Sequence, residues 1–473
     1  MNMIYKILTQ CYYIVERKCI CMKDLTKGNI TKLILLFAVP VLIGNIFQQF
    51  YNLADTAIIG NMLGDKDAIA AVGAVSPVMS LVISFINGLA NGFSIVIGRH
   101  FGAKDMKQLK RSVAGTLVLG LATSFVLTVI SLAFSETIIR ILGTPEEIIK
   151  AANTYITIIF AGMTFTMLYN LFSGILRAIG NTLMPLVFLG AAIVINVGLD
   201  IAFIGIFNMG VEGTALATVI SQIISAILCI IYIFRKCPVL KVSKDDFKNI
   251  TKADALDLYS TGAAMGLMLS IVSIGSVILQ SAINGLGKDT IAAHTLARKI
   301  SEMFMLPLST IGMAASAFIS QNIGAGEIER VKKGIVRSIM LTCIWSAFTI
   351  ISVYLFGDVL LKLIAGSGKD EIISVSWYYL KINTPFYFVL GVLLVMRNSM
   401  QSMGMKVIPV ISSIIELLGK FLVTVLLVPY FDYFGVCIAE PLIWIVMTIW
   451  LVAAYVLKIR SFSLKSEKAV SLG

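Results

Sequence analysis

Runs of apolar residues long enough to cross a lipid bilayer recur along the whole of this chain. A helix needs about 20 residues to span the roughly 30 Å of bilayer hydrocarbon, and lipid offers the backbone no hydrogen bonds. Barrel strands are shorter, at about ten residues. We count twelve runs, at residues 31–60, 69–97, 112–134, 151–174, 182–206, 211–234, 259–284, 290–320, 334–357, 373–396, 407–429 and 434–457. The sequence therefore predicts an all-α polytopic membrane protein with twelve transmembrane helices.

The composition agrees with a chain that faces lipid. Of the 473 residues, 58% are hydrophobic and only 14% are charged. A soluble domain needs about a quarter of its residues charged to cover its surface. Membrane lipid is therefore an expected partner, and the soluble classes are excluded.

The 38 Lys and Arg residues are divided unevenly between the predicted loops. If the loops alternate sides from the N-terminus, one side carries 28 of these residues and the other 6, with four inside predicted helices. By the positive-inside rule the richer side is cytoplasmic, so both termini are predicted to be cytoplasmic. The net charge of +12 then reflects topology, and no nucleic-acid partner is expected.

The chain contains an internal repeat. IAAVG at 69–73 recurs as IAAHT at 291–295, and Gly102-Ala103 recurs as Gly324-Ala325, both at an offset of 222 residues. RAIGNTLMP at 177–185 recurs as QSMGMKVIP at 401–409. The two copies each hold six predicted helices and so keep the same topology. Such a parallel repeat places substrate sites near the interface between the copies.

The repeat sets the predicted domain boundaries, with two pseudo-symmetric six-helix bundles around a central cavity. The parts are a cytoplasmic N-terminal tail (1–30, in which 1–21 reads as an over-extended start), an N-lobe (31–236), a cytoplasmic linker (237–253), a C-lobe (254–458) and a cytoplasmic C-terminal tail (459–473). Two packed halves of this kind suit a transporter that alternates access between the two sides of the membrane.

Two carboxylates occur at predicted membrane depth in the first half, at Asp55 and Asp200. Ionisable groups are costly inside a bilayer, so each is a functional hypothesis by default. On a helical period Gln48, Asn52 and Asp55 share one face of their helix. Asn196 and Asp200 share a face of another helix for the same reason.

Several short motifs follow one another in the order of the predicted helices. They are Pro40, ADTAIIGNMLG (54–64), AAVG (70–73), RAIGNTLMP (177–185), INVGLD (195–200), GVEGTALAT (210–218) and IAAHTLARK (291–299). Within a duplicated twelve-helix frame, this set resembles the multidrug and toxic compound extrusion (MATE) transporters over about residues 28–460, nearest the bacterial DinF-like and MepA-like branch. The resemblance implies the MATE fold and cation-coupled efflux of small, often cationic and lipophilic compounds. We expect a monomer without cofactors in the bacterial cytoplasmic membrane.

The resemblance also implies a cation-coupling site at Asp55, Asn196, Asp200 and Thr218. Two carboxylates that face each other in an apolar bundle cannot both ionise at low cost, so they titrate as one coupled unit. Such a unit can take up and release H⁺. With the nearby Asn and Thr oxygens it also suits Na⁺, and the choice of ion stays open. No other metal is expected.

The second half has no matching pair of acids. At the repeat offset Asp55 faces Val277, and coupling through the first half is therefore favoured. Pro40, with Gly44 one turn on, is the predicted hinge of the first helix. The weaker candidates for the substrate cavity are the polar residues Gln48, Asn52, Gln280, Asn284 and Glu440.

Five ionisable positions in the second half are interpreted as structural. Glu416 and Lys420 are four residues apart in the favourable order and predict a buried ion pair. Arg298 and Glu302 have the reverse order at the same spacing and are expected to pair likewise. His294 is expected to be a wetted structural histidine near the outer end of its helix, with a proton relay as the alternative.

Other functions were weighed against efflux. A flippase for lipid-linked sugars, from a distantly related transporter group, is the main alternative, and it needs cations in its cavity to hold pyrophosphate. A channel is disfavoured by the repeat and by the lack of a pore-like ring of residues. An enzyme is not predicted, because we find no pairing of a nucleophile with a base and no set of metal ligands in the sequence.

Overall fold

The computed structural model describes residues 22–58, 60, 62, 66–141, 143–366 and 370–470, and those residues form helices and connections without strands. The prediction of an all-α polytopic membrane protein is confirmed. The segment predicted as an over-extended start, 1–21, lies outside the described residues.

The helices of the first half lie within residues 22–236, and those of the second half within residues 252–470. The first half forms α2 (Ile30–Ile58), α3 (Lys66–Gly102), α4 (Met106–Ala133), α5 (Ser135–Ile141), α6 (Glu146–Ala161), α7 (Met163–Ala178), α8 (Leu183–Gly205) and α9 (Val211–Lys236). The connection holds η2 (Pro238–Leu240) and α10 (Lys244–Lys248). The second half forms α11 (Lys252–Asn284), α12 (Lys288–Gly324), α13 (Ile328–Ala365), α14 (Asp370–Asn383), η3 (Thr384–Phe386), α15 (Tyr387–Ser402), α16 (Val407–Leu422), η4 (Val423–Leu427) and α17 (Val428–Val470).

Ten helical stretches of the described chain are long and apolar enough to cross a membrane, and the bent pair α6–α7 adds an eleventh. These two helices meet at an angle of 44° around Gly162. A side chain at Gly162 would overlap Val219 of α9, so the glycine lets α9 pack into the bend.

The last stretch, Val407–Lys458, has 52 residues, which is more than twice the length that one span needs. Asp432 has φ 47° and ψ −131°, which lie outside the helical region, and the chain reverses there. Beyond the reversal Trp450 donates to the carbonyl of Ile408 at 3.3 Å, and Ile443 lies against Gly419. The two arms are antiparallel, so the described ranges contain the twelve spans that the sequence predicts.

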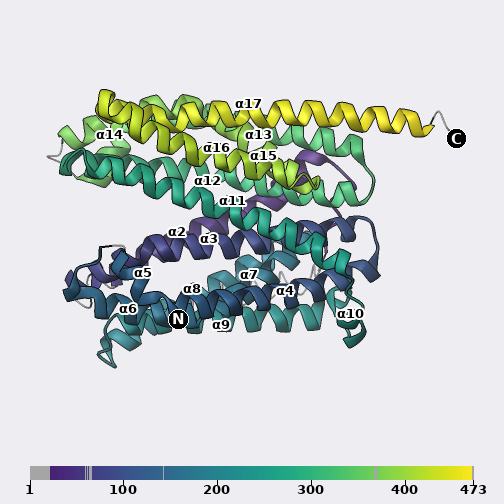
Figure 1. Ribbon diagram of the computed structural model, residues 1–473, viewed down its shortest axis with the longest axis horizontal. Helices are drawn as coiled ribbons and strands as arrows, with labels where there is room; N and C mark the ends of the chain where they lie inside the picture. Colours follow the sequence, from purple (N-terminus) through teal and green to yellow (C-terminus); the bar gives the residue numbers. More distant parts are fainter. Residues whose placement is uncertain are drawn as a thin grey trace, which may run out of the picture.

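The helices form two layers, with first-half helices in one and second-half helices in the other (Figure 1). The junction between the layers is made by α2 and α3 against α11 and α12. Gly88 and Gly92 of α3 bring its backbone onto α11, because a side chain at either glycine would overlap main-chain atoms of α11. The close approach fixes α3 against α11 near the middle of the bundle.

Large apolar side chains cover the outer faces of both layers. Phe125 is 67% exposed, Leu355 68% and Leu363 80%. Apolar area of this extent on a protein surface indicates contact with another apolar phase. For helices of this length the bilayer is that phase.

The two halves are in tight contact at the end where α3 and α12 finish, which we call the basic end. A side chain at Gly102 would overlap the carbonyl of Gln321, and one at Gly324 would overlap the carbonyl of Arg99. Arg99 also forms an ion pair with Asp257 of α11 at 3.0 Å. The basic end is therefore closed in this structure.

Residues 22–29, which we call the N-terminal strap, connect both halves at the basic end. The Lys23 N–H donates to the carbonyl of Ile179 in the first half at 2.8 Å. The Leu25 N–H donates to Oε1 of Gln321 in the second half at 2.9 Å, and Nε2 of Gln321 donates to the Ala178 carbonyl at 2.8 Å. The strap thus adds hydrogen bonds that hold the basic end closed.

Candidate functional site

A cavity of about 360 Å³ lies inside the first half. Side chains from α2, α3, α6, α7 and α9 line it, and most are apolar or aromatic. The predicted residues Gln48, Asp55 and Thr218 are among its lining residues. The side chain of Asn52, which was predicted to share this face, lies outside the described residues.

Asp55 extends from α2 toward this cavity. Its Oδ1 atom is shielded from solvent and has no hydrogen-bond partner among the described residues. A buried carboxylate oxygen without a partner is costly, since an ionised oxygen loses its hydration without compensation. The free energy of the site therefore falls when Asp55 receives a proton or a cation.

Asp200 lies opposite on α8 and is completely buried. With the side-chain amide of Asn196 oriented to satisfy both neighbours, its nitrogen donates to Oδ2 of Asp200 at 3.0 Å and its oxygen accepts from the N–H of Thr218 at 3.2 Å. Oδ1 of Asp200 has no partner in the described structure. The carboxylates of Asp200 and Asp55 are close enough to interact electrostatically. The structure therefore brings the four predicted coupling residues together.

Two tyrosines that sequence reasoning missed belong to the same cluster. The hydroxyl of Tyr51 shares a hydrogen bond of 3.1 Å with that of Thr218. Tyr51 and Tyr155 both interact electrostatically with Asp55 and Asp200. Tyr51 was within reach of the sequence, because it lies one turn before Asp55 on the same helix face. Tyr155 was not, because α6 meets α2 only in the folded chain.

A second cavity, of about 320 Å³, lies in the second half and contains charges of both signs. The predicted residues Gln280 and Glu440 line it. Glu440 forms an ion pair with Arg298 at 2.8 Å and accepts a hydrogen bond from the Tyr379 hydroxyl at 3.2 Å. Asn284 is exposed and accepts a hydrogen bond from Gln280 at 3.0 Å, outside the cavity lining.

The predicted structural charges are found with one correction. Glu416 pairs with Lys420 at 3.1 Å, and Arg298 pairs with Glu302 at 3.5 Å, as expected from their spacing. The prediction of a wetted histidine is wrong, because His294 is 4% exposed. It packs edge-on against Tyr379, which shields it from solvent.

Two arginines that fall in the loops between predicted spans, Arg177 after 151–174 and Arg397 after 373–396, are inside the bundle. Arg397 is 5% exposed and joins the Glu416–Lys420 pair at 3.2 Å from Glu416. Arg177 reaches into a small cavity between the halves. Hydropathy locates a span but not the register of the side chains at its ends, which is why both were misplaced.

The predicted hinge lies within an unbroken helix. α2 continues through Pro40, and Gly44 has Leu186 and Leu189 of α8 at ordinary contact distance. The hinge therefore stays a prediction. In the described part of the chain, no group of three His, Cys, Asp or Glu side chains is arranged to hold a metal ion.

The MatE family model matches the chain twice, over residues 40–202 and 264–426. The two matches begin 224 residues apart, close to the offset of the internal repeat. The probable multidrug resistance protein YoeA of Bacillus subtilis (strain 168) is 30% identical over 400 residues, which are 83% of this chain and 86% of that protein. The multidrug export protein MepA of Staphylococcus saprophyticus is 23% identical, over 80% of this chain and 83% of its own length.

The fold is also that of a solved structure. A multidrug resistance MATE family transporter of the MOP superfamily, in an outward-facing conformation, superposes with a TM-score of 0.84. The match covers 93% of this chain and 98% of that one at 22% sequence identity. The arrangement of helices is therefore shared across nearly the whole chain.

Proposed function

This chain belongs to the MatE family of transporters and is not an enzyme, and we propose that it exports small lipophilic cations by antiport with H⁺ or Na⁺. Its relatives in the family are named as multidrug resistance and multidrug export proteins, which supports drug efflux. The proposal needs no cofactor, since the ion gradient supplies the free energy.

One observation carries the antiport proposal: Asp55 lines the cavity of the first half, Asp200 is buried within electrostatic reach of it, and neither has a cationic partner among the described residues. Neither Asp55 nor Asp200 forms an ion pair in the described part of the chain. A structural carboxylate at this depth is normally paired, because isolated buried charge is costly. An unpaired one can instead exchange its counter-ion, and a coupling ion and a cationic drug can compete for it.

The proposed cycle follows from this competition. With the basic end closed, H⁺ or Na⁺ enters from the opposite side and neutralises the pair of Asp55 and Asp200. Neutralisation removes the attraction for a cationic drug, which leaves on the same side. The emptied carrier then opens at the basic end, releases its ion there and accepts the next drug. A shift of α2 at the proposed hinge, Pro40 and Gly44, would couple the two events.

The orientation completes the proposal. By the positive-inside rule, we propose that the closed end with its basic loops and both termini lie in the bacterial cytoplasm. The chain would work as a monomer of two lobes, 31–236 and 254–458, in the cytoplasmic membrane.

The alternative of a lipid-linked sugar flippase is less well supported. Pyrophosphate recognition needs several uncompensated cations in the cavity. The cavity of the first half is acidic, and in that of the second half Arg298 faces Glu440 and Glu302. Among the described residues, Arg177 is the one cation that lines the cavity between the halves.

The direct test is transport in inverted membrane vesicles, with a fluorescent lipophilic cation dye added to the outside medium. We expect wild-type protein to accumulate the dye when a proton or sodium gradient is imposed, and collapsing each gradient separately identifies the ion. Asp55→Asn and Asp200→Asn keep the size of the side chain but remove the charge, and each should abolish gradient-driven uptake.

The matched control is Glu302→Gln, which removes a half-exposed carboxylate from the second half. It should leave uptake gradient-driven. If both asparagine variants still transport the dye in response to the gradient, the assignment of the coupling site is wrong.

A further inference from the structure

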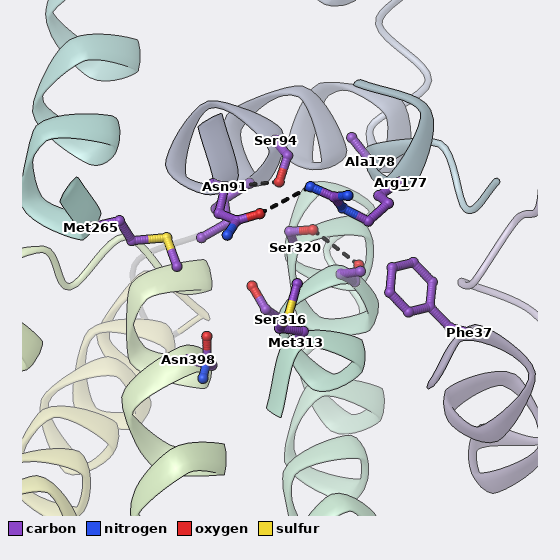
Figure 2. A pocket seen from close by; sticks show the side chains of 12 residues that line it. Phe37, Asn91, Ser94, Arg177, Ala178, Met265, Met313, Ser316, Ser320 and Asn398 are labelled. Carbon is purple, nitrogen blue, oxygen red and sulfur yellow. Dashed lines mark hydrogen bonds between the residues drawn. The ribbon is translucent and has the colours of Figure 1, made fainter. Parts of the chain in front are cut away.

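The cavity between the halves differs in chemistry from the cavities inside them. Helices from both halves converge on it: α2, α3 and α7 from the first, and α11, α12 and α15 from the second. Figure 2 shows Arg177 reaching into it toward Asn91, with Ser316, Ser320 and Asn398 on the opposite wall. The cavity has a volume of about 40 Å³, enough for one small polar group.

Arg177 has hydrogen-bond partners but no counter-charge. One of its terminal nitrogens donates to Oγ of Ser173 at 2.6 Å, and the other donates to Oδ1 of Asn91 at 3.2 Å. Both acceptors are neutral. The groups that interact with Arg177 electrostatically are Tyr169 and Cys229, and no carboxylate among the described residues pairs with it.

The carbonyl end of α7 supplies only part of the missing charge. Arg177 lies in the last turn of this helix, where the helix dipole favours a cation. That effect is equivalent to about half an elementary charge, and it falls off within one turn. A guanidinium group has five N–H donors in a planar fork that suits a carboxylate, so donor capacity remains for a ligand.

The wall of the cavity opposite Arg177 adds hydrogen-bond acceptors and donors that carry no charge. Ser316 shares a hydrogen bond of 2.7 Å with Ser402, and its hydroxyl borders the cavity. The side-chain nitrogen of Asn398 donates to the carbonyl of Leu394 at 2.8 Å. The lining therefore contains one full positive charge and no negative one.

We propose that Arg177 is an anion-binding subsite between the halves, which receives the carboxylate of amphoteric substrates while their cationic part lies outside this small cavity. The proposal deepens the proposed efflux function and rests on it. The small volume admits a carboxylate and excludes the body of a drug. Both halves contribute to the lining, so an anion held there contacts helices that separate when the basic end opens.

The test uses two dyes that differ in one group: a rhodamine with a free carboxylate and its methyl ester, which is a pure cation. Binding is measured at equilibrium by fluorescence polarisation on purified full-length protein in detergent. We expect Arg177→Gln to weaken binding of the carboxylate dye about tenfold or more, because a charge-assisted pair is lost. Binding of the ester should change less than about twofold.

Arg177→Lys keeps the charge without the fork and should give an intermediate loss for the carboxylate dye. Equal weakening of both dyes in Arg177→Gln would overturn the subsite and assign Arg177 to bracing α7 against α3. Unchanged binding of both dyes would overturn it as well.

A further measurement uses wild-type protein alone, so its result does not depend on whether the Arg177 variants fold. Added benzoate should displace the carboxylate dye and leave the ester bound, and displacement of neither dye would contradict the subsite. These measurements record binding in the absence of an ion gradient. They can therefore be interpreted even if the protein proves not to transport in response to a gradient.

Discussion

In the first half of this transporter the carboxylates Asp55 and Asp200 have no cationic partner among the described residues, whereas in the second half Glu440 has one such partner and Glu416 has two. The two halves share one fold, so architecture does not explain the difference. The carboxylates of the second half are neutralised in place. Under the proposed antiport, those of the first half are left unpaired so that they can exchange an ion, and the comparison then separates charge used for stability from charge used for coupling.

The repeat places this difference at equivalent positions. At the offset of 222 residues, Asp55 corresponds to Val277, which is 49% exposed on α11. Thr218 corresponds to Glu440, which the second half neutralises with Arg298. The repeated helix bundle thus carries an acidic cavity in one copy and a charge-balanced cavity in the other.

The largest expected effect on stability comes from Glu416→Gln. It leaves the buried side chains of Arg397 and Lys420 without a counter-charge, which costs about 3–5 kcal/mol. Asp200→Asn should lower the free energy of unfolding by less than about 1 kcal/mol, because it removes an unpaired charge. Unfolding of the purified variants in detergent measures both changes in the free energy of unfolding. Equal losses in Glu416→Gln and Asp200→Asn would contradict the difference drawn between the two halves.

A smaller effect is expected from Glu440→Gln, at about 2–3 kcal/mol, since Tyr379 still offers Arg298 a neutral partner. The double variant Arg298→Met, Glu440→Gln should recover part of this loss, with a coupling energy of about 1 kcal/mol or more in a double-mutant cycle. Strict additivity would show that the pair is not coupled. Transport by either variant should remain gradient-driven.

Gln321→Ala tests whether the N-terminal strap closes the basic end. The variant loses the hydrogen bonds of Gln321 to Leu25 and Ala178, and we expect the closed state to weaken by about 1–3 kcal/mol. Hydrogen exchange of the peptide that contains Leu25 should then accelerate. Unchanged exchange would mean that Gln321 does not hold the strap.

The smallest effect is expected from Glu302→Gln. Its pairing with Arg298 spans 3.5 Å and is half-exposed, and pairs of this kind contribute at most about 0.5 kcal/mol. The free energy of unfolding should therefore stay near the wild-type value. If Glu302→Gln lowered the free energy of unfolding as much as Glu440→Gln does, solvent exposure would not explain the difference between Glu302 and Glu440 as partners of Arg298.

The sequence could predict what depends on run length and local spacing. The twelve spans follow from apolar runs, and the Glu416–Lys420 pair follows from a separation of four residues. The cluster around Asp55 followed from the resemblance of motifs, since α2, α8 and α9 meet only in the folded chain.

What escaped prediction depends on contacts between distant segments. Arg298 and Glu440 are separated by 142 residues, and no local pattern connects them. Arg177 and Arg397 were assigned to loops, because hydropathy does not show where a helix end turns inward. Their positions required the packing of both halves.

The central claim is that Asp55 and Asp200 exchange a coupling ion for a cationic drug. The measurement is binding of the rhodamine methyl ester to purified protein as a function of pH and of Na⁺ concentration. Protonation or Na⁺ binding neutralises the carboxylates, so wild-type affinity should fall as the pH is lowered or as Na⁺ is raised, according to the ion used. We predict that Asp55→Asn and Asp200→Asn abolish this dependence and that Glu440→Gln retains it. Dependence that survives in both asparagine variants, or that disappears only in Glu440→Gln, would contradict the account.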